Sequence, residues 1–86
     1  MHFYITNKST KNLQLISDAL ERNFENIIVG QSTDAQRTFD DLRQLRVDVL
    51  VVDYDLAPFD GLALLRRLKQ ANILPRVIMT ANTPSE

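Results

Sequence analysis

The run VDVLVVD at residues 47–53 constrains the fold of this 86-residue chain more strongly than any other feature. From residue 49 to residue 52 every side chain is apolar, and most are β-branched. A strand with one face in water alternates between apolar and polar residues, whereas a strand buried on both faces reads as a continuous apolar run. We therefore predict that this strand lies inside a parallel sheet with helices on both sides.

Short apolar runs alternate with amphipathic segments along the rest of the chain. Further strands are predicted at residues 2–6, 25–30 and 73–81. Gly30 is expected to stop the second of them. Apolar residues recur at helical spacing between the strands, and helix N-caps are predicted at Ser9 or Thr10, within residues 32–34, and at Asp60. Strands alternating with helices indicate right-handed crossovers and one α/β domain.

Composition excludes several classes of protein. The net charge is −1 and the basic residues are spread along the chain, which is unlike the footprint of a nucleic-acid-binding surface. There is no cysteine, so disulfides and thiolate metal sites are excluded. The longest apolar stretch is too short to span a membrane, and the N-terminus lacks the apolar segment of a signal peptide. We expect a cytoplasmic protein that contacts neither membrane nor nucleic acid directly.

Parallel sheets of this kind carry their sites beyond the carboxyl ends of the strands. Asp53 ends the most buried strand, so we expect the chemistry there. Residues 27–81 resemble the receiver domain of bacterial two-component response regulators. The most specific part is Asp53, then Pro58, with Asp60-Gly61 seven and eight residues after Asp53. The resemblance implies a three-layer flavodoxin-like fold with strand order 2-1-3-4, incomplete here because the family's fifth strand and last helices are absent.

The resemblance also implies a mechanism. Asp53 would accept a phosphoryl group from a histidine kinase, and Thr80 would contact the new phosphate and act as the switch. The backbone carbonyl of Asp55, together with an acidic pair after the first strand, would hold Mg²⁺. The implied process is phosphorelay signalling, usually linked to transcription regulation, and the domain itself is not expected to be an enzyme.

Three departures from the family pattern are visible. No acidic pair follows the first strand, where Asn7-Lys8 fits the helical spacing better than Thr6-Asn7. The match ends after the fourth strand, so residues 1–86 are expected to form a single truncated receiver-like domain, without the family's later lysine. Pro58 falls one position later than usual. We predict weak or no affinity for Mg²⁺ and poor phosphorylation of Asp53, because the main charged ligands are missing.

Two other functions compete with the phosphorylated receiver. One is a pseudo-receiver that acts by protein interaction alone. The other, a small flavin- or nucleotide-binding protein, is disfavoured because Gly30 and Gly61 are the only glycines and form no phosphate-binding loop. Residues 75–81 would form an uncovered apolar sheet edge, and such edges tend to pair. We therefore also predict a homodimer or higher oligomer joined through this strand.

Overall fold

The computed structural model describes residues 1–80 of the chain. Strands and helices alternate from the first residue of the fold to the last. The elements are β1 (His2–Thr6), α1 (Thr10–Glu21), β2 (Ile27–Ser32), α2 (Ala35–Leu42), β3 (Val49–Asp53), α3 (Gly61–Gln70) and β4 (Arg76–Thr80). All strand pairings are parallel and the order across the sheet is β2-β1-β3-β4, so the predicted fold class is confirmed.

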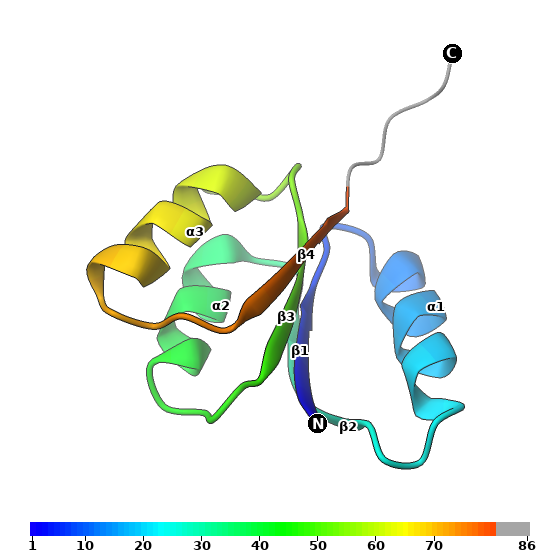
Figure 1. Ribbon diagram of the computed structural model, residues 1–86. Coiled ribbons are helices and arrows are strands. Elements are labelled where there is room, and N and C mark those ends of the chain that lie inside the picture. Colours follow the sequence, from blue (N-terminus) through cyan, green and yellow to red (C-terminus); the bar gives the residue numbers. More distant parts are fainter. Residues whose placement is uncertain (81–86) are drawn as a thin grey trace.

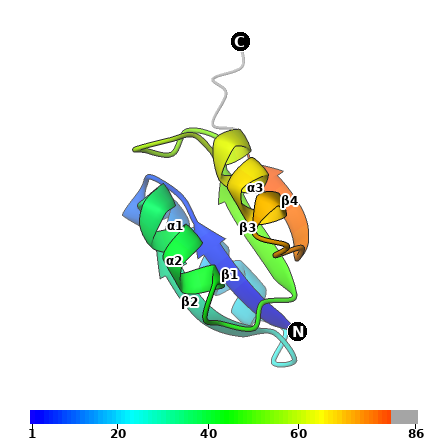
Figure 2. The same cartoon turned by 90° about the vertical axis from the view of Figure 1, so that its left-hand side faces the viewer.

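The helices cover both faces of the sheet. Figure 1 shows α1 on one side of the strands and α2 and α3 together on the other, and the turned view in Figure 2 looks onto the α2 and α3 side. Three layers result, with β1 and β3 in the middle of the sheet. The strand that the sequence marked as buried on both faces is therefore one of the two central strands.

Side chains of β3 divide between two apolar clusters. Val49 and Val51 pack with residues of β1 and α1, such as Leu13, on one face of the sheet. Leu50 and Val52 pack on the other face with residues of α2 and α3. All four of these β3 side chains are at most 5% exposed. The absence of alternation in the sequence is thus explained by two cores that share one strand.

All three helices begin at the expected kind of residue. The Ser9 side chain accepts from the backbone N–H of Asn12, which selects Ser9 over Thr10 as the cap of α1. Asp34 caps α2 and Asp60 caps α3 in the same way. A cap of this kind is worth roughly 1 kcal/mol, because it satisfies a backbone donor that has no partner within the helix.

Strand β2 corrects one expectation. It does not stop at Gly30 but continues to Ser32, and the pairing with β1 shifts register between Phe3 and Tyr4. A β-carbon on Gly30 would lie only 2.7 Å from the ring of Tyr4. The glycine therefore allows the Tyr4 ring to approach the strand, and this close approach, rather than a chain turn, explains its presence.

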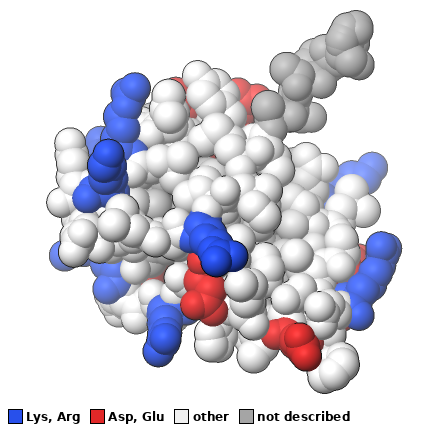
Figure 3. Space-filling view, in the orientation of Figure 1, with Lys and Arg blue, Asp and Glu red and all other residues white. Residues whose placement is uncertain are grey.

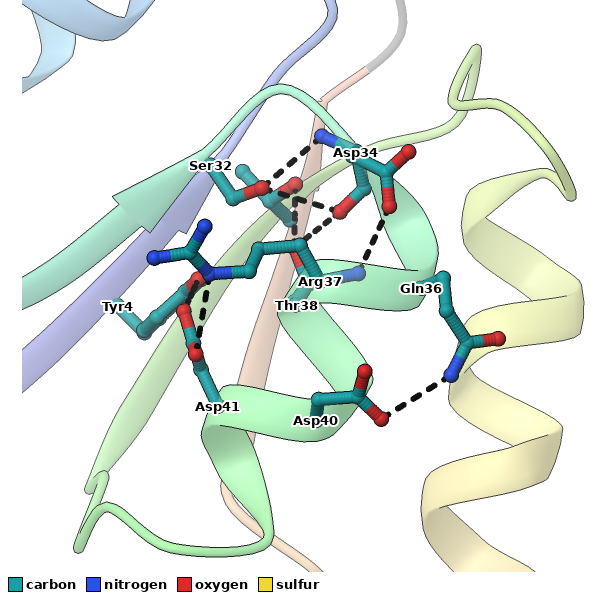
Figure 4. A network of polar contacts seen from close by, with 9 residues as sticks. Tyr4, Ser32, Asp34, Gln36, Arg37, Thr38, Asp40 and Asp41 are labelled. Atoms are coloured by element: carbon teal, nitrogen blue, oxygen red, sulfur yellow. Dashed lines mark hydrogen bonds and ion pairs between the residues drawn. The ribbon is translucent and has the colours of Figure 1, made fainter.

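A polar network joins α2 to the sheet (Figure 4). The hydroxyl of the fully buried Tyr4 donates to Asp41 at 2.6 Å, and the same carboxylate accepts from Arg37 at 3.3 Å. The buried hydroxyls of Thr6 and Thr38 lie 2.9 Å apart. Burial, together with the Asp41 carboxylate, raises the pKa of Tyr4 well above its ordinary value.

Strand β4 lies at the edge of the described sheet, as predicted. Val77, Ile78 and Met79 are 41%, 51% and 39% exposed, although they are apolar. Figure 3 shows broad uncharged surface on the face on which β4 lies, with basic and acidic side chains next to each other near its middle and others around its margin. Within residues 1–80 the outer side of this strand has no neighbouring strand.

Truncation of the central strand should be costly. We predict that Leu50→Ala lowers the free energy of unfolding by on the order of 1–4 kcal/mol, because apolar contacts are lost and a cavity remains. Chemical denaturation measures this change. Leu15→Ala is the control, since Leu15 is 58% exposed on α1 and should change stability by less than about 0.5 kcal/mol. Equal stabilities of the two variants would contradict the assignment of β3 as the centre of the core.

The Tyr4 network predicts a pH dependence of stability. The folded state keeps the Tyr4 proton to higher pH than the unfolded state, so its stabilising effect is complete below pH of about 10 and is lost as the pH rises toward the folded-state pKa. The stability advantage of the wild type over Tyr4→Phe should therefore shrink above pH of about 10, by at most about 1.4 kcal/mol per pH unit. Urea unfolding at several pH values measures it.

Tyr54→Phe serves as the control for this titration, because Tyr54 is 42% exposed. Its unfolding free energy should follow that of the wild type across the alkaline range. If Tyr4→Phe also follows the wild type in parallel, the buried hydroxyl does not hold its proton as described.

Candidate functional site

The carboxyl ends of β1, β3 and β4 come together at the carboxyl-terminal end of the sheet. Parallel strands of adjacent position end side by side, so the residues that follow them are neighbours although they lie far apart in the sequence. Asn7 and Lys8 follow β1, Asp53 ends β3, and Thr80 ends β4. The structure therefore brings the predicted site residues together at this end of the sheet.

Asp53 is held by the backbone on both of its carboxylate oxygens. Its Oδ1 accepts from the N–H of Asp55 at 3.0 Å, and its Oδ2 accepts from the N–H of Lys8 at 3.1 Å. The residue is only 1% exposed. A buried carboxylate is costly unless it is hydrogen-bonded, and these two donors both satisfy it and fix its orientation.

Asn7 turns its side chain toward the start of α1. Its amide oxygen accepts from the N–H of Ser9 at 2.9 Å and lies 3.5 Å from the amide nitrogen of Asn12. The residue is 5% exposed, and its own N–H donates to the carbonyl of Ser32 on β2. Asn7 thus helps to form the turn between β1 and α1, and its oxygen already has donors.

Lys8 brings positive charge to the site. Its ammonium lies 3.9 Å from the carboxylate of Asp55, and both side chains are about half exposed. Lys8 therefore contacts the site twice, through its backbone at Asp53 and through its side chain at Asp55. The sequence predicts that Lys8 lies next to the site but does not predict its backbone contact, since no side-chain pattern encodes it.

Thr80 lies opposite Asp53 in the register of β3 and β4. Its hydroxyl donates to the carbonyl of Val52 at 3.4 Å, and its own carbonyl accepts from the N–H of Tyr54 at 2.9 Å. Strand pairing thus sets the position of Thr80 next to the acidic residue. Residue 81, which the sequence pattern grouped with Thr80, lies outside the described residues.

The loop between β3 and α3 is fixed by its close packing against β3. A β-carbon on Gly61 would lie 2.5 Å from the carbonyl oxygen of Asp53, so only glycine permits this approach. The Gly61 N–H also donates to the carbonyl of Tyr54. The Ala57-Pro58 peptide in this loop is cis. Asp60 of the sequence motif is therefore explained by helix capping, and Gly61 by the lack of room for a side chain.

The residues present do not suit Mg²⁺. This ion favours carboxylate oxygens in an octahedral arrangement. The position of the expected acidic pair holds an amide that is already hydrogen-bonded and a lysine. Among residues 1–80 no three histidine, cysteine, aspartate or glutamate side chains are grouped so that they could hold a metal ion. The donor set at Asp53 therefore does not fit the divalent ion that the sequence resemblance implies.

None of the helices in residues 1–80 combines the length and the apolar character needed to cross a bilayer.

Comparison with protein families gives one match over nearly the whole chain. The model of the response regulator receiver domain family matches residues 4–86. A protein-glutamate methylesterase/protein-glutamine glutaminase of Syntrophomonas wolfei is 31% identical over 68 residues, which are 79% of this chain but 19% of that protein. The chain thus spans about a fifth of this curated relative.

Solved structures resemble the fold. The signal receiver domain of the putative response regulator NarL from Mycobacterium tuberculosis superposes with a TM-score of 0.89 at 15% identity, over 98% of this chain and 68% of that one. RcsB from Salmonella enterica serovar Typhimurium, bound to a promoter in the presence of the phosphomimetic BeF₃⁻, gives 0.87 at 22% identity, over 99% and 72% of the two chains. At these identities the likeness concerns the fold.

Proposed function

This chain belongs to the response regulator receiver domain family, and on that premise we propose that it takes part in two-component signalling with Asp53 as its phosphoryl acceptor. The observation that carries the proposal is the position of Asp53 at the carboxyl end of a central strand, with Thr80 opposite it on β4. This is the edge where parallel sheets of this kind hold their ligands.

The proposed step transfers a phosphoryl group from a phosphohistidine of a kinase. A carboxylate oxygen of Asp53 attacks phosphorus, an O–P bond forms, and the P–N bond to the imidazole breaks, with the electron pair leaving on nitrogen. The product places new anionic oxygens beside Thr80. In the unmodified protein the Thr80 hydroxyl donates to the carbonyl of Val52. After transfer it would turn to the phosphate, and this movement is the proposed signal. The long 3.4 Å bond that the hydroxyl gives up is weak.

The proposed acceptor is expected to react slowly. Each oxygen of Asp53 accepts one backbone hydrogen bond, which makes the carboxylate a weaker nucleophile, and the residue is 1% exposed, which limits the approach of a donor. Charge neutralisation is also limited, since the donor set does not suit Mg²⁺.

The remaining assignments follow from the family. We propose a cytoplasmic receiver, formed by residues 1–86 as one domain, whose partners are a histidine kinase and an output that regulates transcription. The esterase activity in the name of the Syntrophomonas relative is not assigned to this chain, because the match covers 19% of that protein. A pseudo-receiver and a flavin- or nucleotide-binding protein have less support, since Asp53 stands at the acceptor position of the receiver motif.

Acetyl phosphate tests the acceptor directly. We expect slow, partial formation of a phosphoryl adduct on the wild-type protein, detected by intact mass and located on Asp53 by peptide analysis. Asp53→Asn should form none. Asp60→Asn is the matched control, because asparagine caps a helix as well as aspartate does, and it should react like the wild type. An adduct that persists in Asp53→Asn, or a wild type that stays unmodified after prolonged incubation, would contradict the proposal.

The exposed strand β4 supports a proposal about self-association. In an antiparallel two-fold pairing centred on Ile78, Val77 would face Met79 of a second copy and Arg76 would face Thr80. Such a register opposes apolar side chains and avoids like charges, which favours cross-strand pairing. The chain of residues 1–86 is then a homodimer or a larger assembly, and residue 81 of the expected contact lies outside the described residues.

Sedimentation at tens of micromolar tests this pairing. We expect the wild type to associate and Val77→Lys to be monomeric, since each chain would then place a charged lysine in the contact between the two β4 strands. Leu15→Lys is the control, because Leu15 is also exposed, at 58% against 41% for Val77, but lies on α1, and it should associate normally. A well-folded wild type that is strictly monomeric would rule out the dimer.

A further inference from the structure

Lys8 occupies a position that its sequence pattern alone does not explain. Its backbone is fixed by the bond from its N–H to Asp53 Oδ2, so its Cα cannot move away without breaking a contact of the proposed acceptor. Its ammonium lies 3.9 Å from the carboxylate of Asp55, two residues after Asp53. Lys8 therefore contacts residues 53–55 at two points, once through its backbone and once through its side chain.

The charge requirement of the site is clear from the chemistry. Phosphoryl transfer onto a carboxylate gathers negative charge, and positioned cations have to offset it. Among residues 1–80 no three histidine, cysteine, aspartate or glutamate side chains are grouped so that they could hold a metal ion, and no acidic pair follows β1. A lysine ammonium binds phosphate as a point charge, without the ligand set that a metal needs.

We propose that Lys8 provides the cation of the Asp53 site in place of Mg²⁺ and binds the phosphoryl group as it is transferred. This inference rests on the proposed function of Asp53 and adds to it the residue that binds phosphate. In the unphosphorylated protein the ammonium pairs with Asp55, and the arriving phosphoryl oxygens, which carry more charge than one carboxylate, draw it to Asp53. Lys8 exchanges no atom in this step: an O–P bond forms at Asp53, and the bond from phosphorus to the leaving group of the donor breaks.

The first measurement is a titration with Mg²⁺ alone, followed by the amide signals of Lys8, Asp53 and Asp55 in NMR spectra. We expect no saturable change in the wild type up to tens of millimolar. The double variant Asn7→Asp/Lys8→Asp restores two carboxylates and should bind Mg²⁺ in the millimolar range. Saturable binding by the wild type at low millimolar concentration would overturn the proposal.

The second measurement is the rate of Asp53 modification by acetyl phosphate, with excess EDTA or with Mg²⁺. The wild type should react at the same rate in both. Lys8→Gln should react at least about tenfold more slowly, because the charge is lost while the backbone donor remains. Lys8→Arg should retain most of the rate. Lys11→Gln removes another exposed lysine from the same region and is the control that should leave the rate unchanged.

The outcomes separate this inference from the proposed function. A wild type that reacts only with Mg²⁺, or a Lys8→Gln variant that reacts as fast as the wild type, overturns the role of Lys8 and leaves Asp53 as the acceptor. Failure of every protein to react, including the double variant with Mg²⁺, contradicts the acceptor role itself. The Mg²⁺ titration then still decides whether the wild-type site excludes the metal.

Discussion

Burial of β3 on both faces is the constraint that fixes the layers of the fold and the place of the site. Val49 and Val51 pack in one apolar core, and Leu50 and Val52 pack in the other. Both faces of β3 are therefore buried only when it lies between two helical layers. Such layers require crossover helices and parallel strands. Parallel strands in turn end at one edge, which brings Asp53 next to the residues that follow β1 and to the end of β4.

This constraint explains why so much of the fold could be predicted. The continuous apolar run, the helical spacing of leucines and the capping residues are local features, and each one points to the same architecture. Gly30 was misread because glycine in a strand can mean either a stop or a close approach, and only the position of the Tyr4 ring decides between them. Side-chain pairs such as Tyr4 and Asp41 join distant segments and leave no local pattern in the sequence.

The candidate site could be predicted in part. Asp53, Thr80 and the missing acidic pair follow from spacing and from the resemblance. The two N–H donors on Asp53 could not be foreseen, because backbone groups carry no residue-specific signal and depend on the turns after β1 and β3. The pairing of Lys8 with Asp55 depends on the same turns. Because of this pairing, the site does not only lack metal ligands but also contains a cation, the ammonium of Lys8.

Phosphorylation of Asp53 should change the surroundings of the groups that contact or face its side chain. Lys8 and Asp55 donate their backbone N–H to its two oxygens, and Thr80 lies opposite it across the β3–β4 pairing. A ¹H–¹⁵N NMR spectrum recorded before and after treatment with acetyl phosphate tests this most directly. We expect the largest shifts at the amides of Lys8, Asp55 and Thr80. A phosphorylated protein in which these three signals stay in place while others move would contradict it.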